Sequence, residues 1–280
     1  GIGLSVAQTI VEQHKGKITE QLTSFTGKKI VFNGALSMSL FPSPDITARN
    51  VRVYSPDEQD LDKPLMKIDN LVAKLSLSSL LAGKFDVKMM SLHRPDILIE
   101  RTDSGWNWGD NSEARGEGLS KDINISLDSL MLDDATMRII DEEREINTTL
   151  DNLKAEIVAD SLRGPYRVDG SFYKNNQLQG FAISIGNLSE SFASNLNFVL
   201  NQPSSETYVR FDGTFLLSNE AINGNLVLES KNFKQFYDSS FGLGELGEYF
   251  NKPLETSMEL KVNQTQMELS NVIVDRKSVV

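Results

Sequence analysis

The sequence contains no cysteine among its 280 residues and only two histidines, His14 and His93. The absence of cysteine excludes disulfide bonds, thiol catalysis and cysteine-based zinc sites. Two histidines leave no room for a histidine-rich metal site and little for a Ser-His-Asp triad. No Gly-rich phosphate loop, metal-ligand spacing or nucleophile elbow follows residue 18. The sequence therefore predicts no cofactor and a protein that is not an enzyme.

Positive charge and long apolar runs are also scarce. The formal net charge is -11 and the sequence pI is about 4.8. Because a nucleic-acid partner requires a basic surface, nucleic acid is excluded as an expected partner. No run of about 18 apolar residues is present, so no segment is expected to cross a membrane as a helix. With 39% hydrophobic residues, the chain can still bury a core.

Three segments carry helical signals. Apolar residues in 4–25 recur at spacings of three and four, which is typical of an amphipathic helix, and Gly27 suits a left-handed helix end. The stretch around 77–83 predicts a short helix. Residues 232–252 interrupt the strand pattern and are expected to hold another short helix.

Most of residues 28–274 instead show a period of two, with apolar and polar side chains alternating. This pattern predicts a mainly β, mostly antiparallel sheet with one apolar face. The clearest alternating sets are Leu36/Met38/Leu40, Leu71/Ala73/Leu75, Phe85/Val87/Met89, Ile97/Ile99, Val168/Gly170/Phe172, Phe181/Ile183/Ile185, Leu196/Phe198/Leu200, Ile222/Gly224/Leu226/Leu228 and Met258/Leu260/Val262.

Several polar or aromatic groups lie between these sets. His93 is expected in a surface turn between two strands, and the acidic groups at 133–134 and 141–143 are expected on solvated turns. Trp106-Asn107-Trp108 is interpreted as closing one end of the apolar face, with an aromatic binding platform as the alternative. Residues 89–103 weakly resemble residues 127–141 at an offset of 38, which suggests similar strands in one sheet.

The order and spacing of eight short segments in residues 20–108 resemble the N-terminal region of the AsmA family of Gram-negative envelope proteins. Residues 120–274 resemble the more variable middle region of that family. The eight segments are 26–30, 34–36, 39–44, 50–53, 64–68, the turn at 77–83, 94–97 and 105–108.

The resemblance implies a protein of outer-membrane biogenesis that is anchored in the inner membrane by a native N-terminal helix, absent from this chain, with a periplasmic body. Larger relatives resemble bridge-like lipid carriers, in which a long, curved antiparallel sheet forms an apolar groove. Phospholipid and envelope assembly proteins are the partners this implies. The alternating residues expected to line the groove are Leu36, Met38, Leu40, Leu71, Ala73, Leu75, Val87, Met89, Ile97 and Ile99.

Two alternatives fit the same pattern. The alternation also builds a closed β-sandwich core, in which two apolar faces meet. A scaffold that binds assembly factors by adding strands at a sheet edge would regulate outer-membrane protein assembly without carrying lipid.

The two ends of the chain carry other resemblances. Residues 1–18 resemble an ATP-lid fragment of sensor histidine kinases and are interpreted as a foreign fragment, with a native helix as the alternative. The chain lacks the other parts of a kinase ATP site, so no ATP binding is predicted. Residues 275–280 resemble translated sequencing adapter. The expected organisation is a helix at 1–25, β regions at 26–109 and 123–274, a linker at 110–122 and a tail at 275–280.

Overall fold

The computed structural model describes residues 19, 23 and 26–275, apart from gaps at 40, 42, 57, 59, 82–86, 103–104, 110–127, 160, 162, 217–220, 242–245 and 264–265. The described chain is mainly β and mostly antiparallel, which confirms the predicted fold class. It forms two units, residues 1–154 and 155–280, and the boundary falls inside strand β8 (Ile146–Ala159). The expected foreign fragment at 1–18, the linker at 110–122 and residues 276–280 of the tail lie outside the described residues.

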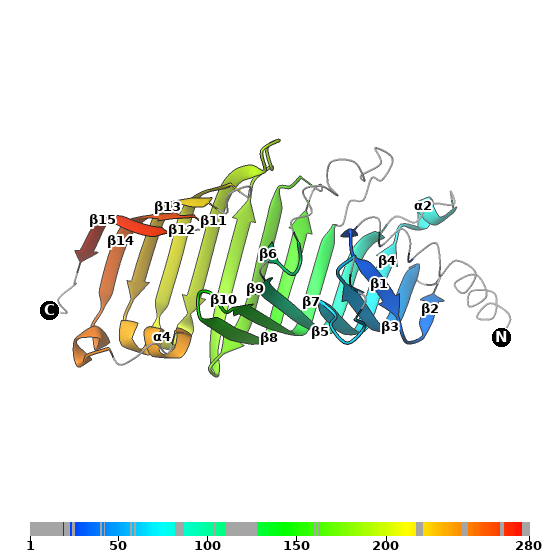
Figure 1. The fold of residues 1–280 in the computed structure, drawn as a ribbon, viewed down its shortest axis with the longest axis horizontal. Coiled ribbons are helices and arrows are strands. Elements are labelled where there is room, and N and C mark those ends of the chain that lie inside the picture. The colour runs from blue at the N-terminus through cyan, green and yellow to red at the C-terminus, as the bar shows by residue number, and fades with distance from the viewer. Residues whose placement is uncertain are drawn as a thin grey trace. The chain divides into compact units, whose positions relative to one another are not determined.

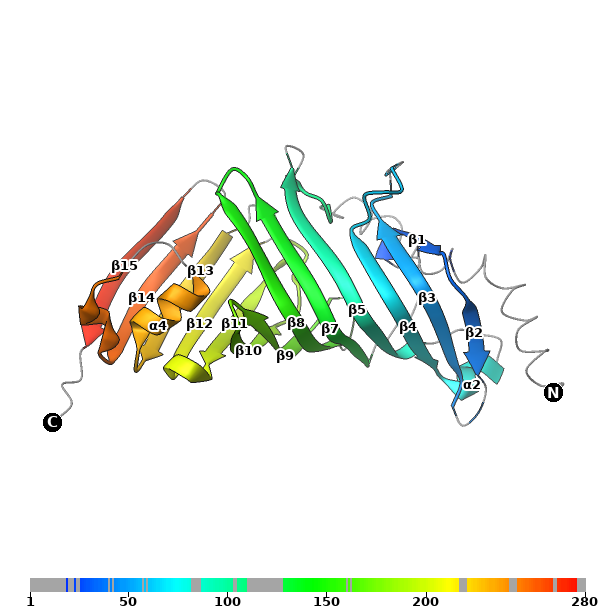
Figure 2. The same cartoon turned by 90° about the horizontal axis from the view of Figure 1, so that it is seen from below.

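In the first unit, hydrogen-bonded neighbours follow the order β1, β3, β4, β5, β7 and β8, while β2 pairs with β3 and β6 with β5 (Figures 1 and 2). Alternate apolar residues on β1, β3, β4 and β5 pack together in one buried cluster. The elements are β1 (Lys29–Phe32), β2 (Leu36–Ser39), β3 (Asp45–Tyr54), β4 (Met66–Leu75), α2 (Leu77–Leu81), β5 (Val87–Thr102), β6 (Gly105–Trp106) and β7 (Ser129–Asp141).

Two of the predicted helical features are confirmed. Residues 19, 23 and 26 are helical, and the backbone N–H of Gly27 donates to the carbonyl of Thr23 at 2.8 Å. Gly27 has a φ of 62°, so a residue without Cβ ends the helix as expected. The short helix α2 lies within the predicted range 77–83.

Three strands of the first unit contain a left-handed residue at the same level of the sheet. Asn50, Arg94 and Asp134 have φ values of 49°, 48° and 56°. Arg94 lies between the pairs that align β5 with β4 and with β7, and the register continues past it without a shift. At this row β3, β5 and β7 therefore exchange the positions that point to the two sides of the sheet.

The exchange keeps apolar residues on one side along the whole strand. In β3 the buried residue Ala48 on one side of Asn50 and the buried residues Val51 and Val53 on the other side belong to one apolar cluster. The predicted turn at His93 is therefore wrong: β5 is one continuous 16-residue strand. The change of phase around His93 reflects a left-handed residue inside the strand.

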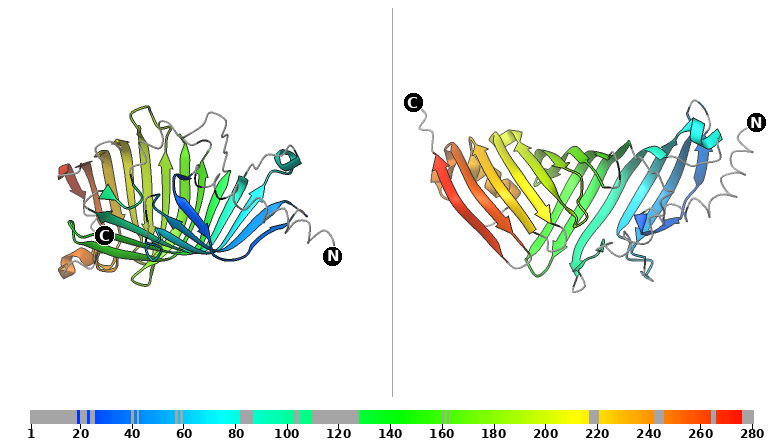
Figure 3. Two further views of the ribbon diagram at one scale, coloured as in Figure 1. Left: turned by 45° about the vertical axis from the view of Figure 1, so that its right-hand side comes forward. Right: turned by 90° about the horizontal axis from the view of Figure 1, so that it is seen from above.

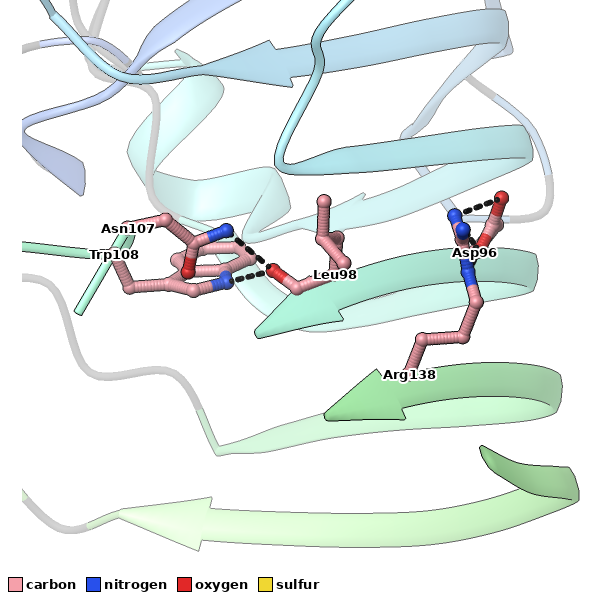
Figure 4. Close-up of polar contacts among 5 residues, drawn as sticks. All are labelled: Asp96, Leu98, Asn107, Trp108 and Arg138. Carbon is pink, nitrogen blue, oxygen red and sulfur yellow. Dashed lines mark hydrogen bonds and ion pairs between the residues drawn. The ribbon is translucent and has the colours of Figure 1, made fainter. Parts of the chain in front are cut away.

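The pairing of β5 with β7 is parallel, which the sequence did not predict. The two strands are the two segments of the weak sequence repeat, so similar strands do lie side by side. Their structural offset is 40 residues, as in Met89 opposite Ser129, and not 38. Arg138 of β7 donates to both carboxylate oxygens of Asp96 of β5, at 3.1 and 3.2 Å, across this seam (Figure 4).

The segment after β5 folds back and caps a free stretch of that strand. Trp108 Nε1 and Asn107 Nδ2 both donate to the carbonyl of Leu98, at 2.7 and 3.0 Å (Figure 4). Asn107 Oδ1 accepts from the N–H of Glu100 at 2.9 Å, and Asn107 N–H donates to the carbonyl of Glu100 at 2.7 Å. The segment thus occupies backbone groups that a neighbouring strand would otherwise take. Trp108 therefore helps to hold this segment in place. That the two indoles close one end of the apolar face stays a prediction.

The second unit contains the rest of β8 followed by strands in simple sequential order, each antiparallel to the next (Figure 3, yellow-green to red). The elements are β9 (Tyr166–Lys174), β10 (Gln177–Ile185), β11 (Ala193–Gln202), the 3-10 turn η1 (Pro203–Ser205), β12 (Thr207–Leu216), β13 (Ala221–Ser230), α4 (Phe233–Ser240), the 3-10 turn η3 (Glu248–Asn251), β14 (Leu254–Val262) and β15 (Met267–Asp275).

Helix α4 lies within the predicted range 232–252 and begins at Asn232, whose side chain accepts from the N–H of Gln235 at 3.0 Å. It lies at one end of the strands of this unit (Figure 1). Phe236, only 3% exposed, anchors it, and its ring lies 6.2 Å from that of Phe233 and 6.0 Å from that of Phe241. An aromatic cluster therefore holds α4 in place.

Candidate functional site

The residues predicted to line an apolar groove belong to three strands of the first unit. Leu40 lies outside the described residues. The other nine are Leu36 and Met38 in β2, Leu71, Ala73 and Leu75 in β4, and Val87, Met89, Ile97 and Ile99 in β5.

Most of these side chains come together in packed clusters. Leu36 lies opposite Ala48 of β3, which lies opposite Leu71 of β4. Leu71, Leu75 and Ile97 are only 8%, 6% and 7% exposed. Leu71 packs with residues of β1, β3 and β5, and Leu75 packs with residues of β2, β3 and β5, as in a closed core. That they line a groove stays a prediction.

An irregularity in β5 decides which of its residues join the cluster. The register shifts between Lys74 and Leu75, so Val87 lies opposite Leu75 while Met89 lies opposite Lys74. Val87 and Met90 pack against the apolar cluster. Met90 was missed because the sequence alternation was extended through Val87 to Met89 without allowing for an irregularity.

The second unit presents an apolar face of a different kind, which we call the β9–β14 face. Its side chains come from alternate positions of six strands and align in rows across the sheet. Of its large apolar residues, only Phe211 is buried, and the others are partly exposed. The central row is Val168, Ile183, Phe198, Phe211, Leu226 and Met258.

The opposite side of the same strands is polar. Asp212, Asn225 and Glu259 alternate with the apolar residues and lie opposite one another on β12, β13 and β14. The sheet of the second unit is therefore amphipathic, with no comparable buried cluster over its apolar side among the described residues. These alternating sets were not predicted as lining residues, although their alternation in the sequence is as clear as that of the first unit.

A buried polar chain closes one end of the β9–β14 face beneath α4. Gln202, Thr207 and Ser230 are 1%, 0% and 5% exposed. Ser205 Oγ donates to Gln202 Oε1 at 2.7 Å. Since the single hydroxyl proton of Ser205 is then used, the Thr207 hydroxyl donates to Ser205 Oγ at 2.7 Å. For the same reason, the Ser230 hydroxyl donates to Thr207 Oγ1 at 2.6 Å. Each hydroxyl in the chain thus has a partner, as a buried polar group requires.

Two glutamines join this polar chain and its neighbourhood to the helix. Gln202 Nε2 donates to Ser239 Oγ at 2.9 Å, and Gln179 Nε2 donates to Ser240 Oγ at 3.2 Å. The β9–β14 face therefore ends in polar groups on the side of α4. An amphiphile on this face would have its apolar part on the strands and its polar part towards α4.

Lys174 lies at this same end. It is the last residue of β9, two positions after Phe172, which lies opposite Gln179. Alternation places the lysine side chain on the β9–β14 face, where it is half-buried. Burial lowers the pKa of Lys174 below its ordinary value, because desolvation disfavours the charged ammonium.

The outer side of the first unit carries a small charged group. His93 Nδ1 lies 3.0 Å from Asp133 Oδ2, and Lys154 Nζ lies 3.5 Å from Asp133 Oδ1. The hydrogen bond from His93 is the main reason why the pKa of Asp133 lies below its ordinary value. All three side chains are about half exposed or more, which makes this an ordinary surface ion-pair group. Asp133 lies inside β7, so the prediction of a turn there is wrong.

The acidic stretch 141–143 does lead into a turn, but Asp141 is not solvated. Its side chain is 1% exposed and accepts from Arg144 Nη1 at 2.8 Å and from the Arg144 N–H at 3.2 Å. Burial of the carboxyl opposes ionisation, but the hydrogen bonds from Arg144 outweigh it and lower the pKa of Asp141. The residue therefore holds the β7–β8 turn in place.

The described residues contain no group of three His, Asp or Glu side chains placed to hold a metal ion. In the described part of the chain, no helix has the length and apolar character needed to cross a bilayer. The candidate site is thus the β9–β14 face together with its polar end.

Comparison with known proteins gives one match. A model of the AsmA family matches residues 3–275. Neither curated proteins nor solved structures gave a match.

Proposed function

Since the chain belongs to the AsmA family, an envelope-associated family, we propose that it holds phospholipid on the β9–β14 face during outer-membrane biogenesis. In this proposal the native protein is anchored in the inner membrane and its body lies in the periplasm. The lipid's acyl chains lie against the apolar side chains, and its head group lies towards the polar end. The family is not known for enzymes, and the proposal requires no catalytic group.

The observation that supports this proposal most strongly is the partial exposure of the β9–β14 face. A sheet side built from Phe, Leu, Ile and Val that served only as core would be covered, as the apolar clusters of the first unit are. Each methylene that such a surface removes from water contributes about 0.8 kcal/mol. Ten buried methylenes would then supply about 8 kcal/mol. Because removing the same methylenes from a bilayer costs a similar free energy, an acyl chain can pass between the bilayer and this face.

The first test measures bound lipid directly. We expect the chain, purified from cells without detergent, to carry phospholipid that organic extraction and mass spectrometry detect in a roughly constant molar ratio. Incubation with fluorescent phospholipid vesicles should load the protein, and the loaded protein should deliver lipid to acceptor vesicles. A folded protein that neither carries nor accepts lipid would contradict the proposal.

A scaffold function is the second candidate, and one observation favours it. Strand β15 is the last in the hydrogen-bonding order of the described strands. Met267 and Ile273 on it are 70% and 65% exposed. An added strand from an assembly factor would cover such an edge. Specific capture of one envelope protein along β15, without lipid on the β9–β14 face, would favour the scaffold.

A further inference from the structure

The β9–β14 face carries a single charge. In strands β9 to β14, the described positions that alternate onto this face are apolar, glycine or neutral polar, with one exception. The exception is Lys174. Charged residues are otherwise confined to the opposite side, as Asp169, Arg210, Asp212 and Lys261 illustrate. A cation placed on an apolar face calls for a physical reason, because its desolvation is unfavourable.

No contact among the described residues supplies that reason. Lys174 makes no ion pair and no side-chain hydrogen bond with the described residues, in contrast to Lys231 with Glu206 at 2.5 Å and Lys234 with Asp238 at 2.7 Å. Desolvation alone accounts for its lowered pKa, with no opposing attraction from a carboxylate. The ammonium is therefore half-buried and has no carboxylate partner among the described residues, which leaves it suited to bind an anion.

The hairpin fixes where this cation lies. Asn175 and Asn176 have φ values of 49° and 61°, which form a tight two-residue turn and place Lys174 opposite Gln177. The Asn175 side chain donates to the carbonyl of Ser239 of α4 at 2.8 Å. Lys174 is thus held beside the polar end of the β9–β14 face, and the apolar residues of β9 extend away from it.

The dimensions suit one lipid. From Phe172 back to Tyr166, β9 spans about 20 Å at roughly 3.3 Å per residue. On the β9–β14 face it presents Phe172, Gly170, Val168 and Tyr166 over this length. The acyl chains of one bilayer leaflet span about 15 Å, half of the hydrocarbon core. An acyl chain can therefore lie along β9 and β10 while its head group reaches Lys174.

We infer that Lys174 binds the phosphate of an anionic phospholipid whose acyl chains lie along β9 and β10 towards Tyr166 and Ile185. This inference rests on the proposed function and specifies its lipid class. Lipids without net charge still occupy the β9–β14 face, but they gain less from Lys174, because their own cationic group competes for the phosphate. The lysine therefore selects among lipids that the apolar side chains hold equally well.

The test compares two variants with the same change of charge. The full chain, Lys174→Gln and Lys261→Gln are incubated with vesicles of equal parts phosphatidylglycerol and phosphatidylcholine, and the protein-bound lipids are quantified. Lys261 lies on the polar side of β14 and is exposed, so it controls for net charge. Because Lys174 makes no side-chain contact with a polar group in the described part of the chain, Lys174→Gln should fold with an unchanged thermal transition.

We expect the wild type and Lys261→Gln to bind about threefold to tenfold more phosphatidylglycerol than phosphatidylcholine. One charge-assisted hydrogen bond is sufficient for a preference of this size. Lys174→Gln should bind the same total lipid without enrichment. Equal enrichment in Lys174→Gln, or none in the wild type, would overturn the inference while leaving lipid binding intact. In a further arm, oleate is added to the vesicles. If the protein prefers oleate to phosphatidylglycerol, the site binds a carboxylate, and the inference of phosphate binding is overturned. Absence of any bound lipid in the wild type would instead contradict the proposed function.

Discussion

Gly213 of β12 lies directly opposite Gly224 of β13 on the β9–β14 face, and the ring of Phe211 fills the space that two side chains would occupy. A Cβ placed on Gly224 would lie 2.7 Å from Phe211 Cζ and 2.4 Å from the carbonyl oxygen of Asp212. This explains why Phe211 is 5% exposed although its neighbours in the row are not buried. The ring lies over the glycine pair and covers backbone that would otherwise face water.

Gly224→Ala should therefore destabilise the second unit by about 1–3 kcal/mol, because the new methyl group must displace the Phe211 ring or the backbone. Urea unfolding monitored by far-ultraviolet circular dichroism measures the change in stability. Gly247→Ala is the matched control. Its φ is -61° and a Cβ there meets no atom within 4 Å, so the same substitution should change stability by less than about 0.5 kcal/mol. Equal effects at the two positions would contradict the packing described.

The Asp141–Arg144 contact predicts an acid-sensitive turn. Because the pKa of Asp141 is lower in the folded than in the unfolded chain, the ionised carboxylate stabilises the fold above its unfolded pKa. That stability is lost as the pH falls below the ordinary range of an aspartate pKa and through the lower folded pKa. Asp141→Asn should lower stability at pH 7 and flatten its decline in acid. Thermal unfolding from pH 7 to pH 3 checks this, and parallel pH profiles for the two proteins would rule out the role given to Asp141.

The cap on β5 predicts a structural role for Asn107. Its side chain contacts backbone groups of both Leu98 and Glu100. Asn107→Ala would leave the Glu100 N–H without this partner and the Leu98 carbonyl with Trp108 alone. We expect a loss of about 1–3 kcal/mol and faster amide exchange at Glu100. Asn225→Ala, at an exposed position of β13, should have little effect. Unchanged exchange at Glu100 in the first variant would show that the cap is dispensable.

Alternation was sufficient to predict a mainly β chain, because one apolar side per strand is what a one-sided sheet needs. It was insufficient near Arg94 and Asp133, where left-handed residues shift the phase inside a strand and the shift resembles a turn. The weak repeat indicated similar strands, but only the structure shows that β5 and β7 are parallel neighbours. Gly27 was predictable, because a helix end has a strong local requirement for a residue without Cβ.

Alternation also could not separate closed from exposed apolar faces. Leu75 and Leu226 occupy equivalent positions in their sequence patterns, yet Leu75 is 6% exposed within a packed cluster and Leu226 is only half-buried. What covers a side chain is decided by residues distant in sequence. For the same reason Lys174 carried no signal by itself: its position became informative only when the rest of the face proved uncharged.

The two leucines should therefore respond differently to a carboxylate. Leu75→Asp buries an unpaired charge and should cost about 3–5 kcal/mol, which is enough to unfold the first unit. Leu226→Asp places the charge on a partly exposed face and should cost about 1–2 kcal/mol while reducing bound lipid. Circular dichroism and lipid quantification on both proteins separate the outcomes. A folded Leu75→Asp that binds less lipid would show instead that the predicted lining in the first unit is accessible.

Site-specific photo-crosslinking in cells tests the central proposal most directly. A photoreactive amino acid at position 226 lies on the β9–β14 face, and one at position 225 lies on the polar side of the same strand. We predict phospholipid adducts from position 226 and from position 198 in the same row, and none from position 225. A folded, membrane-anchored native protein that captures no lipid from positions 226 and 198, or captures it equally from 225, would contradict the proposal that this face holds phospholipid.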